Sequence, residues 1–350
     1  ERQGFVVSVL NDAMMAFRPW LWVVVVVVFF PFVKVVVTSS SSGGSAQKRD
    51  DVTLVTQTTP EKLWMLPALC DRWRGPLSLA LWTNESTVVP HSGRCDPLSV
   101  SRVFDDGGAY PVNLLRNVAV ARANTTYHLV SDMDFLPSAG LRAAARRYAE
   151  EDVALVVPAF QRRGGNCHTL ESCRRRVEPL DLKVPKTFDG LKDCLAEKKC
   201  VAFQSENSPT SHSTTDVALW LEQQQDQSRT LACFRSARYE PYLVLFGETS
   251  PPYDERFVGY GKNKIQHVAH LRYLGLRFKV IPRHFLVHVP HPRSSAKKQW
   301  SHSYETHTSV DNLYDTFVDE LKRNYTQPKV RLCHGTHGKK TALRPAAAAP

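Results

Sequence analysis

Short β-branched runs alternate with segments of helical spacing along the first half of this 350-residue sequence. "VTLVTQTT" (52–59) and "LSLALWT" (77–83) are typical of buried strands, and "YPVNLLRNVAVARA" (110–123) has the apolar spacing of a helix. This alternation favours an α/β domain with a mostly parallel central sheet and helices on both faces. Ligands of such sheets bind at the carboxyl ends of strands, so functional side chains are expected there.

Two aspartates lie at one such strand end. In "YHLVSDMDFLPS" (127–138) an apolar strand leads to Asp132 and Asp134, and a turn at Pro137 follows. Side chains two residues apart in an extended chain point the same way, so the two charges repel unless a cation screens them. A carboxylate pair can hold Mg²⁺ or Mn²⁺ and leave coordination positions for a substrate diphosphate. The alternative is a solvated turn, because such triplets also arise by chance.

The composition is that of a globular protein with a basic surface. Hydrophobic residues make up 43% of the chain, and its formal net charge of +11 is spread along the sequence. A chain of this length can bury the core of one large domain or two smaller ones. Neither zinc-finger spacing nor an RNA-binding aromatic motif accompanies the charge, so no nucleic-acid partner is expected. Phosphate-bearing ligands, acidic glycans and anionic membranes all suit such a surface.

An apolar N-terminal stretch predicts a signal-anchor. "WLWVVVVVVFFPFVKVVV" (20–37) would span roughly 27 Å as a helix, close to the thickness of a bilayer, although Pro31 and Lys34 weaken it. The alternative is a buried pair of valine-rich strands. The polar stem linker at 38–50 favours the anchor.

The residues before the anchor would form a short cytosolic tail. Residues 1–19 contain Met14 and Met15, either of which could be the natural start, and Arg18 would then supply the flanking positive charge. The rest of the chain would face the lumen.

Cysteines and sequons point to the same compartment. The cysteine count is eight, and the pairs Cys167/Cys173 and Cys194/Cys200 lack metal-type CxxC spacing, so disulfides are favoured over zinc. Three sequons that could accept glycans lie at Asn84, Asn124 and Asn324.

The catalytic domain is expected to cover residues 51–335. Within it, 161–238 is polar and rich in Cys, Ser and Gln without clear periodicity, which is typical of an elaborated insertion that contacts an acceptor or a partner. Residues 336–350 are expected to be a disordered tail.

Several motifs together resemble glycosyltransferase family 49. "LVTQTT", "YPVNLLRN", "SDMDFLPS", "EPYLVLF", "RFVGYGKNK" and "FLVHVPHP" occur in that family's order, over roughly residues 52–333. The chain looks like the glucuronyltransferases of α-dystroglycan glycosylation, which include the LARGE glucuronyltransferase domain. The resemblance implies a GT-A type, Rossmann-like fold that binds a UDP-sugar. It also implies a single-pass type II protein of the Golgi membrane with a lumenal catalytic domain.

The resemblance implies a metal site as well. Asp132, Asp134 and His288 would hold Mn²⁺, with Mg²⁺ possible, because an imidazole can complete a carboxylate site. His284 and His291 are interpreted as flanking residues. A zinc site on His284 and His288 is not favoured, because prolines bracket a strand instead of a helix there.

The donor is expected to lie on seven residues: Thr56, Gln57, Asn113, Arg116, Asn117, Asn263 and Lys264. The first two would contact the uridine, and the middle three share one helix face by their spacing. Arg116 would pair with a phosphate or with the sugar carboxylate, and a surface ion pair is its alternative. Lys264 would bind the glucuronate carboxylate.

Inversion at the anomeric carbon requires a general base, and the resemblance leaves two carboxylates near the donor loop. Asp254 is favoured over Glu255, although either could cap the backbone or pair with Arg256 instead. His212 and Asp216 are expected at the acceptor. Asp216 replaces the family's usual Asn, which leaves the acceptor open.

The function expected from these motifs is a metal-dependent, inverting transfer of glucuronic acid from UDP-glucuronate to a glycan, xylose-terminated by resemblance. One alternative is another UDP-sugar donor, a hexose, HexNAc or xylose. The other is a catalytically silent glycan-binding homologue, against which the intact Asp132, Asp134 and His288 argue.

Overall fold

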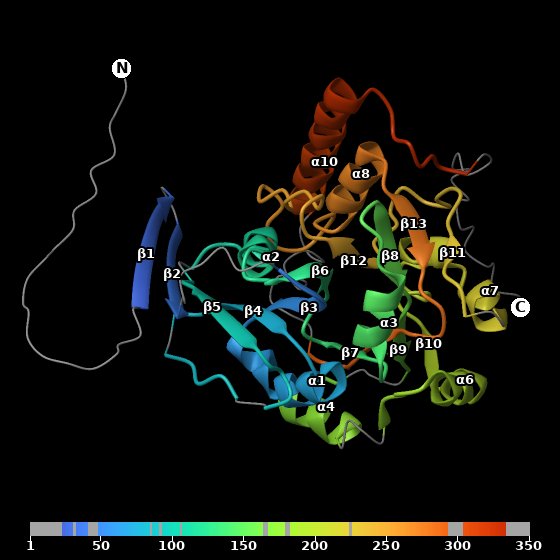
Figure 1. The fold of residues 1–350 in the computed structure, drawn as a ribbon, viewed down its shortest axis with the longest axis horizontal. Helices are drawn as coiled ribbons and strands as arrows, with labels where there is room; N and C mark the ends of the chain where they lie inside the picture. Colours follow the sequence, from blue (N-terminus) through green and yellow to red (C-terminus); the bar gives the residue numbers. More distant parts are fainter. Residues whose placement is uncertain are drawn as a thin grey trace, which may run out of the picture.

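The structure of this chain is a computed structural model. It describes residues 23–30, 33–40, 48–84, 86–90, 93–105, 107–163, 167–178, 183–223, 226–292 and 304–333. The predicted tails at 1–19 and 336–350 and most of the stem linker therefore lie outside the described residues. Figure 1 shows a large twisted sheet with helices around it and a smaller sheet beside it.

The large sheet contains ten strands in the order β1-β2-β5-β4-β3-β6-β12-β8-β13-β11. These strands are β1 (Val23–Phe30), β2 (Val33–Ser40), β3 (Arg49–Thr58), β4 (Leu77–Trp82), β5 (Leu98–Val103), β6 (Thr125–Val130), β8 (Val153–Val157), β11 (Arg229–Thr230), β12 (Tyr242–Phe246) and β13 (Arg277–Val280). The neighbours β5, β4, β3 and β6 are parallel, as the alternation predicted.

The second half of the sheet differs from the mostly parallel prediction. Strand β12 runs antiparallel to both of its neighbours, β6 and β8. The chain leaves β8 and returns to β12 through residues 158–241, and an antiparallel neighbour needs no crossover to the opposite edge of the sheet. The amino end of β12 therefore lies beside the carboxyl ends of β6 and β8. The α/β fold class is confirmed, with a mixed instead of a mostly parallel sheet.

Helices cover both faces of the sheet. They are α1 (Leu66–Trp73), α2 (Val112–Val120), α3 (Leu141–Tyr148), α4 (Leu170–Val177), α6 (Phe188–Ala196), α7 (Val217–Glu222), α8 (Ile265–Leu274) and α10 (Tyr304–Tyr325), with a 3₁₀ helix η1 (Pro60–Met65). Because side chains alternate along a strand, Leu54 packs into the main core with α1 and α3, whereas Val55 packs into a second cluster with α2.

A four-stranded sheet, in the order β10-β9-β14-β7, adjoins the carboxyl edge of the large sheet. Its strands are β7 (Phe135–Pro137), β9 (Ala159–Arg162), β10 (Cys200–Ala202) and β14 (Leu286–His288). Strand β14 pairs antiparallel with β7, and His288 lies opposite Phe135. The small sheet therefore brings the end of β14 to the paired aspartates.

The backbone of the apolar N-terminal stretch forms a pair of strands, which was the alternative to the predicted signal-anchor. Strands β1 and β2 form an antiparallel hairpin, and β2 pairs with β5 at the edge of the sheet. Valine is β-branched, so such runs suit a strand as well as an apolar helix. Among the described residues, none of the helices combines the length and the hydrophobicity that a membrane span requires. The anchor predicted at 20–37 stays a prediction.

The segment at 161–238 is more regular than its sequence suggests. Its described residues form three short α-helices, two 3₁₀ helices and two short strands, and two disulfides each close a small loop within it. Covalent bonds therefore order a region in which apolar periodicity is weak.

All eight cysteines are in disulfides, and none is free. The pairs are Cys70–Cys95, Cys167–Cys173, Cys194–Cys200 and Cys233–Cys333. The prediction of disulfides instead of zinc is confirmed. The last pair has a sequence separation of 100 residues and ties the chain after α10 to the segment before β12.

We expect the stability contributions of the disulfides to follow the lengths of the loops that they close. In the chain-entropy model, loss of the Cys233–Cys333 bond costs about 4.7 kcal/mol, whereas loss of the Cys167–Cys173 bond costs about 2 kcal/mol. Urea unfolding of the two double Cys→Ser variants measures both. Equal losses would show that native contacts, and not loop closure, set the effect.

Candidate functional site

The paired aspartates lie on a turn between β6 and β7. The turn gives the two carboxylates separate surroundings. Asp132 meets side chains from α2, β12 and the start of α8, and Asp134 meets the end of β14 and the helix η1. The expectation that both carboxylates share one extended face therefore does not describe this turn.

Asp132 accepts four hydrogen bonds. Its Oδ1 accepts from Gln57 Nε2 at 3.2 Å and from Arg116 Nη2 at 3.2 Å. Its Oδ2 accepts from the Tyr242 hydroxyl at 2.9 Å and from Lys264 Nζ at 3.2 Å. Three of the predicted donor residues thus converge on this carboxylate.

Two cations keep Asp132 ionised. Burial alone would raise the pKa of this carboxyl, but Lys264 and Arg116 more than offset that cost, and its pKa lies well below the usual range. The Arg116 side chain is only 3% exposed. It is therefore a buried ion pair instead of the surface pair considered as its alternative.

Asp134 belongs to a cluster with two histidines. Its Oδ2 lies 2.6 Å from His291 Nε2 and 3.7 Å from His288 Nε2. The backbone N–H of Val289 donates to the Asp134 carbonyl at 2.7 Å, which fixes the end of β14 against the turn. Potential ligand atoms of Asp134, His288 and His291 all lie within 4.8 Å of one another.

This cluster fits a divalent cation. Asp134 Oδ1 is buried and accepts no hydrogen bond from the described residues. Lys62 Nζ lies 2.8 Å from Asp134 Oδ2 and 3.3 Å from His291 Nε2, so a positive group already lies between two of the three potential ligands. One carboxylate and two imidazoles form an oxygen and nitrogen ligand set that suits Mn²⁺ or a similar metal.

The set differs from the predicted one in one member. His291, interpreted from the sequence as a flanking residue, joins Asp134 and His288, whereas Asp132 is not within the cluster of ligand atoms. His284 lies elsewhere and shares a hydrogen bond with Ser138 at 3.2 Å.

The two asparagines of the predicted donor face hold the loop before α8. Asn113 Nδ2 donates to the Asp254 carbonyl at 2.8 Å. Asn117 donates to the Tyr253 carbonyl at 2.9 Å and to Glu255 Oε1 at 2.8 Å. In this state these amides position the loop, and Arg116 alone of that helix face reaches the paired aspartates.

The two carboxylates predicted as the base are both engaged locally. Asp254 pairs with Arg256, whose Nη2 lies 2.6 Å from its Oδ2, and Arg256 also pairs with Glu320 at 2.6 Å. Glu255 accepts from Asn117. The structure therefore shows Asp254 in the alternative role, a local ion pair with Arg256. The role of Asp254 as a general base stays a prediction.

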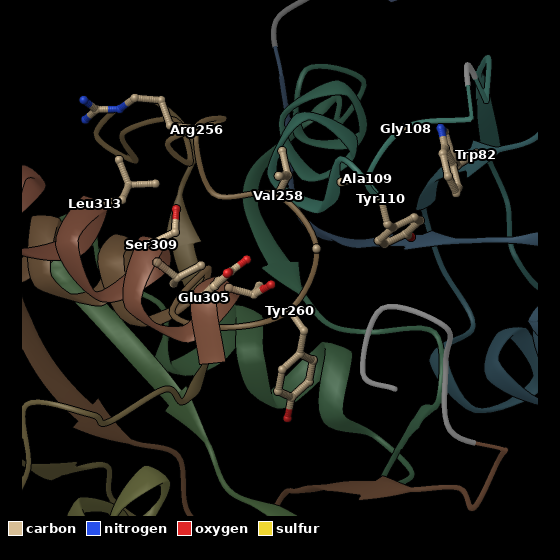
Figure 2. A pocket seen from close by; sticks show the side chains of 13 residues that line it. Trp82, Gly108, Ala109, Tyr110, Arg256, Val258, Tyr260, Glu305, Ser309 and Leu313 are labelled. Atoms are coloured by element: carbon tan, nitrogen blue, oxygen red, sulfur yellow. The ribbon is translucent and has the colours of Figure 1, made fainter. Parts of the chain in front are cut away.

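A cavity of about 460 Å³ lies beside Tyr110, which is hydrogen-bonded to the predicted uridine residue Gln57. It is lined by Trp82, Gly108, Ala109, Tyr110, Arg256, Val258, Gly259, Tyr260, Glu305, Thr306, Ser309, Val310 and Leu313. Figure 2 shows Trp82 and Tyr110 on one side and the α10 residues Ser309 and Leu313 on the other.

A hydrogen-bonded chain connects this cavity to Asp132. The Tyr110 hydroxyl donates to Gln57 Oε1, and Gln57 Nε2 donates to Asp132. Thr56 Oγ1 is buried and has no partner in the described residues. Asn263 accepts from Arg116 at 3.0 Å and donates to the Gly259 carbonyl at 3.3 Å, so it links the cavity wall to the same network.

The two predicted acceptor residues have different surroundings. His212 stacks beside Tyr242 with 6.5 Å between ring centroids, and its buried Nε2 has no partner among the residues described. Asp216 caps α7 by accepting from the Leu219 N–H at 3.3 Å, and it also pairs with Arg235. Only His212 thus adjoins the residues around Asp132.

Three residues of the site were not predicted. Lys62, Tyr242 and His291 reach it from η1, β12 and the end of β14. The sequence offered one signal for His291 as a metal ligand: only Val289 and Pro290 separate it from the predicted ligand His288. Tyr242 lies at the site because its neighbour Leu243 pairs with Val130 of β6, and no local sequence motif predicts this pairing.

The positions of the three predicted glycosylation sites are compatible with glycan attachment. Asn84, Asn124 and Asn324 are all exposed. Their modification stays a prediction.

Sequence comparison identifies relatives of this chain. The family described as "Glycosyl-transferase for dystroglycan" matches residues 51–94 and 94–326. "Xylosyl- and glucuronyltransferase LARGE2" of Mus musculus is 35% identical over 291 residues, which cover 79% of this chain and 39% of that protein. "Xylosyl- and glucuronyltransferase LARGE1" of Homo sapiens is 31% identical over 290 residues, with 79% and 36% covered. The chain thus spans less than half the length of these curated relatives.

Solved structures show only a distant likeness. S. aureus TarS in complex with UDP-GlcNAc has 10% identity and a TM-score of 0.46, covering 80% of this chain and 68% of that chain. GalNAc-T7 with UDP, GalNAc and Mn²⁺ has 10% identity and a TM-score of 0.42, with 82% and 56% covered.

We expect Lys62→Met to strengthen metal binding in the absence of nucleotide. The Lys62 ammonium competes with a metal for Asp134 Oδ2, so the Mn²⁺ concentration at half-saturation should fall roughly tenfold for each 1.4 kcal/mol by which Lys62 stabilises the metal-free carboxylate. The metal-free variant should be less stable by about 1–3 kcal/mol, because a buried charge loses its partner. Thermal shift across a Mn²⁺ titration measures both effects.

The matched control is Lys199→Met, which removes an exposed lysine. Weaker Mn²⁺ binding in Lys62→Met would show that this lysine supports the metal site instead of competing for it.

Proposed function

Because this chain belongs to the family described as "Glycosyl-transferase for dystroglycan", we propose that it transfers a sugar from a UDP-sugar donor to a glycan. The proposed donor is UDP-glucuronate and the proposed reaction is metal-dependent and inverting. The observation that carries the proposal is the convergence of a potential metal cluster and two cations on the paired aspartates at the carboxyl edge of the sheet.

Asp134, His288 and His291 would hold the metal, with Asp132 beside them. Mn²⁺ is the proposed ion and Mg²⁺ the second choice, because a site with two imidazole ligands suits Mn²⁺ better than Mg²⁺, which prefers oxygen ligands. When bound, the metal acts as a Lewis acid that neutralises the diphosphate leaving group.

The chain's own cations would orient the donor. Arg116 and Lys264 lie on opposite oxygens of Asp132, so two cations would face a donor bound beside that carboxylate. We assign Arg116 to the diphosphate, because it is the more buried of the two. We assign Lys264 to the glucuronate carboxylate.

The uridine is proposed to enter the cavity beside Tyr110 and Trp82. Gln57, at the end of β3, reaches the cavity wall through its hydrogen bond with Tyr110. Thr56 lies on the other face of β3, because side chains alternate along a strand, so its contact with the uridine stays a prediction. An aromatic wall with a few polar groups suits a nucleobase.

The proposed location is the Golgi lumen, with a single-pass type II anchor. Four disulfides and three exposed sequons support a secretory compartment. The membrane association rests on the apolar segment at 20–37, whose described residues form strands, so a membrane flotation experiment with the full chain would decide it.

The test of the reaction is UDP release by the full chain with Mn²⁺ and a panel of UDP-sugars. We expect release that is selective for UDP-glucuronate and absent without metal. Asp134→Asn should lose it, because the cluster loses its only carboxylate. Absence of turnover together with absence of metal-dependent thermal stabilisation by UDP would favour the glycan-binding alternative, because a protein without a donor site gains no stability from UDP.

We expect Lys264→Met to change donor choice. Loss of a charge-assisted bond worth about 1.5–3 kcal/mol should lower kcat/KM for UDP-glucuronate by about 10–100-fold, with a smaller loss for UDP-glucose, which lacks the carboxylate. Steady-state kinetics with the two donors measures this. Equal losses would place Lys264 on Asp132 or the diphosphate instead of on the sugar.

A further inference from the structure

Glu240 lies directly before β12, at the edge of the sheet that carries the paired aspartates. Its backbone N–H donates to the Ser211 carbonyl at 3.0 Å, so the chain enters β12 beside the segment that contains His212. Two residues later, the Tyr242 hydroxyl contacts both Asp132 and Lys264. The antiparallel direction of β12 is what places its start at this edge.

Several charges of the site act on Glu240. Lys264 and Arg116 attract its carboxylate, and Asp132 repels it. The same carboxylate raises the pKa of Tyr260, which lines the cavity, although burial is the larger cause. Glu240 thus lies within electrostatic range of the paired aspartates and of the cavity wall.

The carboxylate of Glu240 is uncommitted. No described residue donates a hydrogen bond or forms an ion pair with it, whereas Asp132, Asp134 and Asp254 are each held by a cation. Its side chain is half-buried, so a carboxylate with no protein partner faces the candidate site with a free oxygen, and such a group needs an explanation.

Burial raises the pKa of Glu240 above its usual range, against the attraction of Lys264. A carboxylate with a raised pKa is a stronger proton acceptor. The neighbouring His212 has the opposite character, because burial lowers its pKa to about 3. Its imidazole is therefore a poor proton acceptor and a better hydrogen-bond donor.

We propose that Glu240 is the general base of the transfer reaction, and that the acceptor hydroxyl approaches between Glu240 and His212. This inference rests on the proposed glycosyltransferase function and replaces Asp254 in that role. It assigns the acceptor side of the site to the start of β12, opposite the loop before α8.

The transfer is a single displacement at the anomeric carbon. The acceptor oxygen forms a bond to the anomeric carbon while its proton passes to the Glu240 carboxylate. The bond from the anomeric carbon to the diphosphate breaks, and its electron pair leaves on the β-phosphate oxygen of UDP. Configuration inverts, because the nucleophile enters opposite the leaving group.

The test uses Glu240→Gln in the full chain, with UDP-glucuronate, Mn²⁺ and three nucleophiles: water, p-nitrophenyl β-xyloside and azide. The variant keeps the side-chain shape and the backbone bond to Ser211. A general base contributes about 10²–10⁴-fold, so kcat for water and for the xyloside should fall by at least about 100-fold. Azide has no proton to lose, so formation of glucuronosyl azide should stay within about threefold of the wild-type rate.

Two comparisons separate a base from a structural residue. Glu248→Gln removes an exposed carboxylate after the other end of β12 and should leave all three rates unchanged. Asp254→Asn tests the competing assignment. If Asp254→Asn shows the selective loss and Glu240→Gln does not, the inference is wrong.

The remaining outcomes are also decisive. Equal loss for azide and hydroxyl nucleophiles in Glu240→Gln would give it a structural role and overturn the inference. Failure of the proposed function is a different result, because the wild-type chain would then release no UDP with any nucleophile. Thermal stabilisation of Glu240→Gln by UDP and Mn²⁺ equal to that of the wild type shows that its donor site is intact.

Discussion

A half-buried carboxylate and a buried one, one residue apart, each lie against a cationic side chain that offsets the cost of their charge. Asp132 is held by Arg116 and Lys264, and Asp134 by Lys62 and the adjoining histidines. Burial alone would favour their protonation. Strands, helices and loops that are distant in sequence all meet here to supply these charges, so the positions of α2, η1, α8 and β14 are tied to one turn. The folded core and the candidate site therefore depend on the same electrostatic balance.

Local sequence signals were sufficient to predict those site residues whose position depends on a single strand, helix or turn. The strand before Asp132, the helix that carries Arg116 and the position of Lys264 after the glycines could all be read from the sequence, and the structure brings these three residues together. The α/β class could be predicted for the same reason, because alternation of strand and helix is a local property.

The other residues depend on long-range pairing, which has no local signal. Tyr242 reaches Asp132 because β12 is antiparallel, and His291 reaches Asp134 because β14 pairs with β7. Lys62 lies in a 3₁₀ helix whose sequence carries no metal motif. The valine runs illustrate a different limit, since β-branched apolar residues suit both a sheet and a bilayer. Hydropathy alone could not choose between these two environments.

The pairing of β12 on both sides has a consequence for sequence variation. Leu243 lies opposite Val130 of β6 and Val156 of β8, so neither edge of the strand is free to slide. A slip of one residue would turn every side chain of β12 to the other face of the sheet and move Tyr242 away from Asp132. An insertion or deletion of one residue between Tyr242 and Leu243 would thus turn Tyr242 away from Asp132 while the rest of the strand keeps its pairing. Strand register is here a specificity determinant.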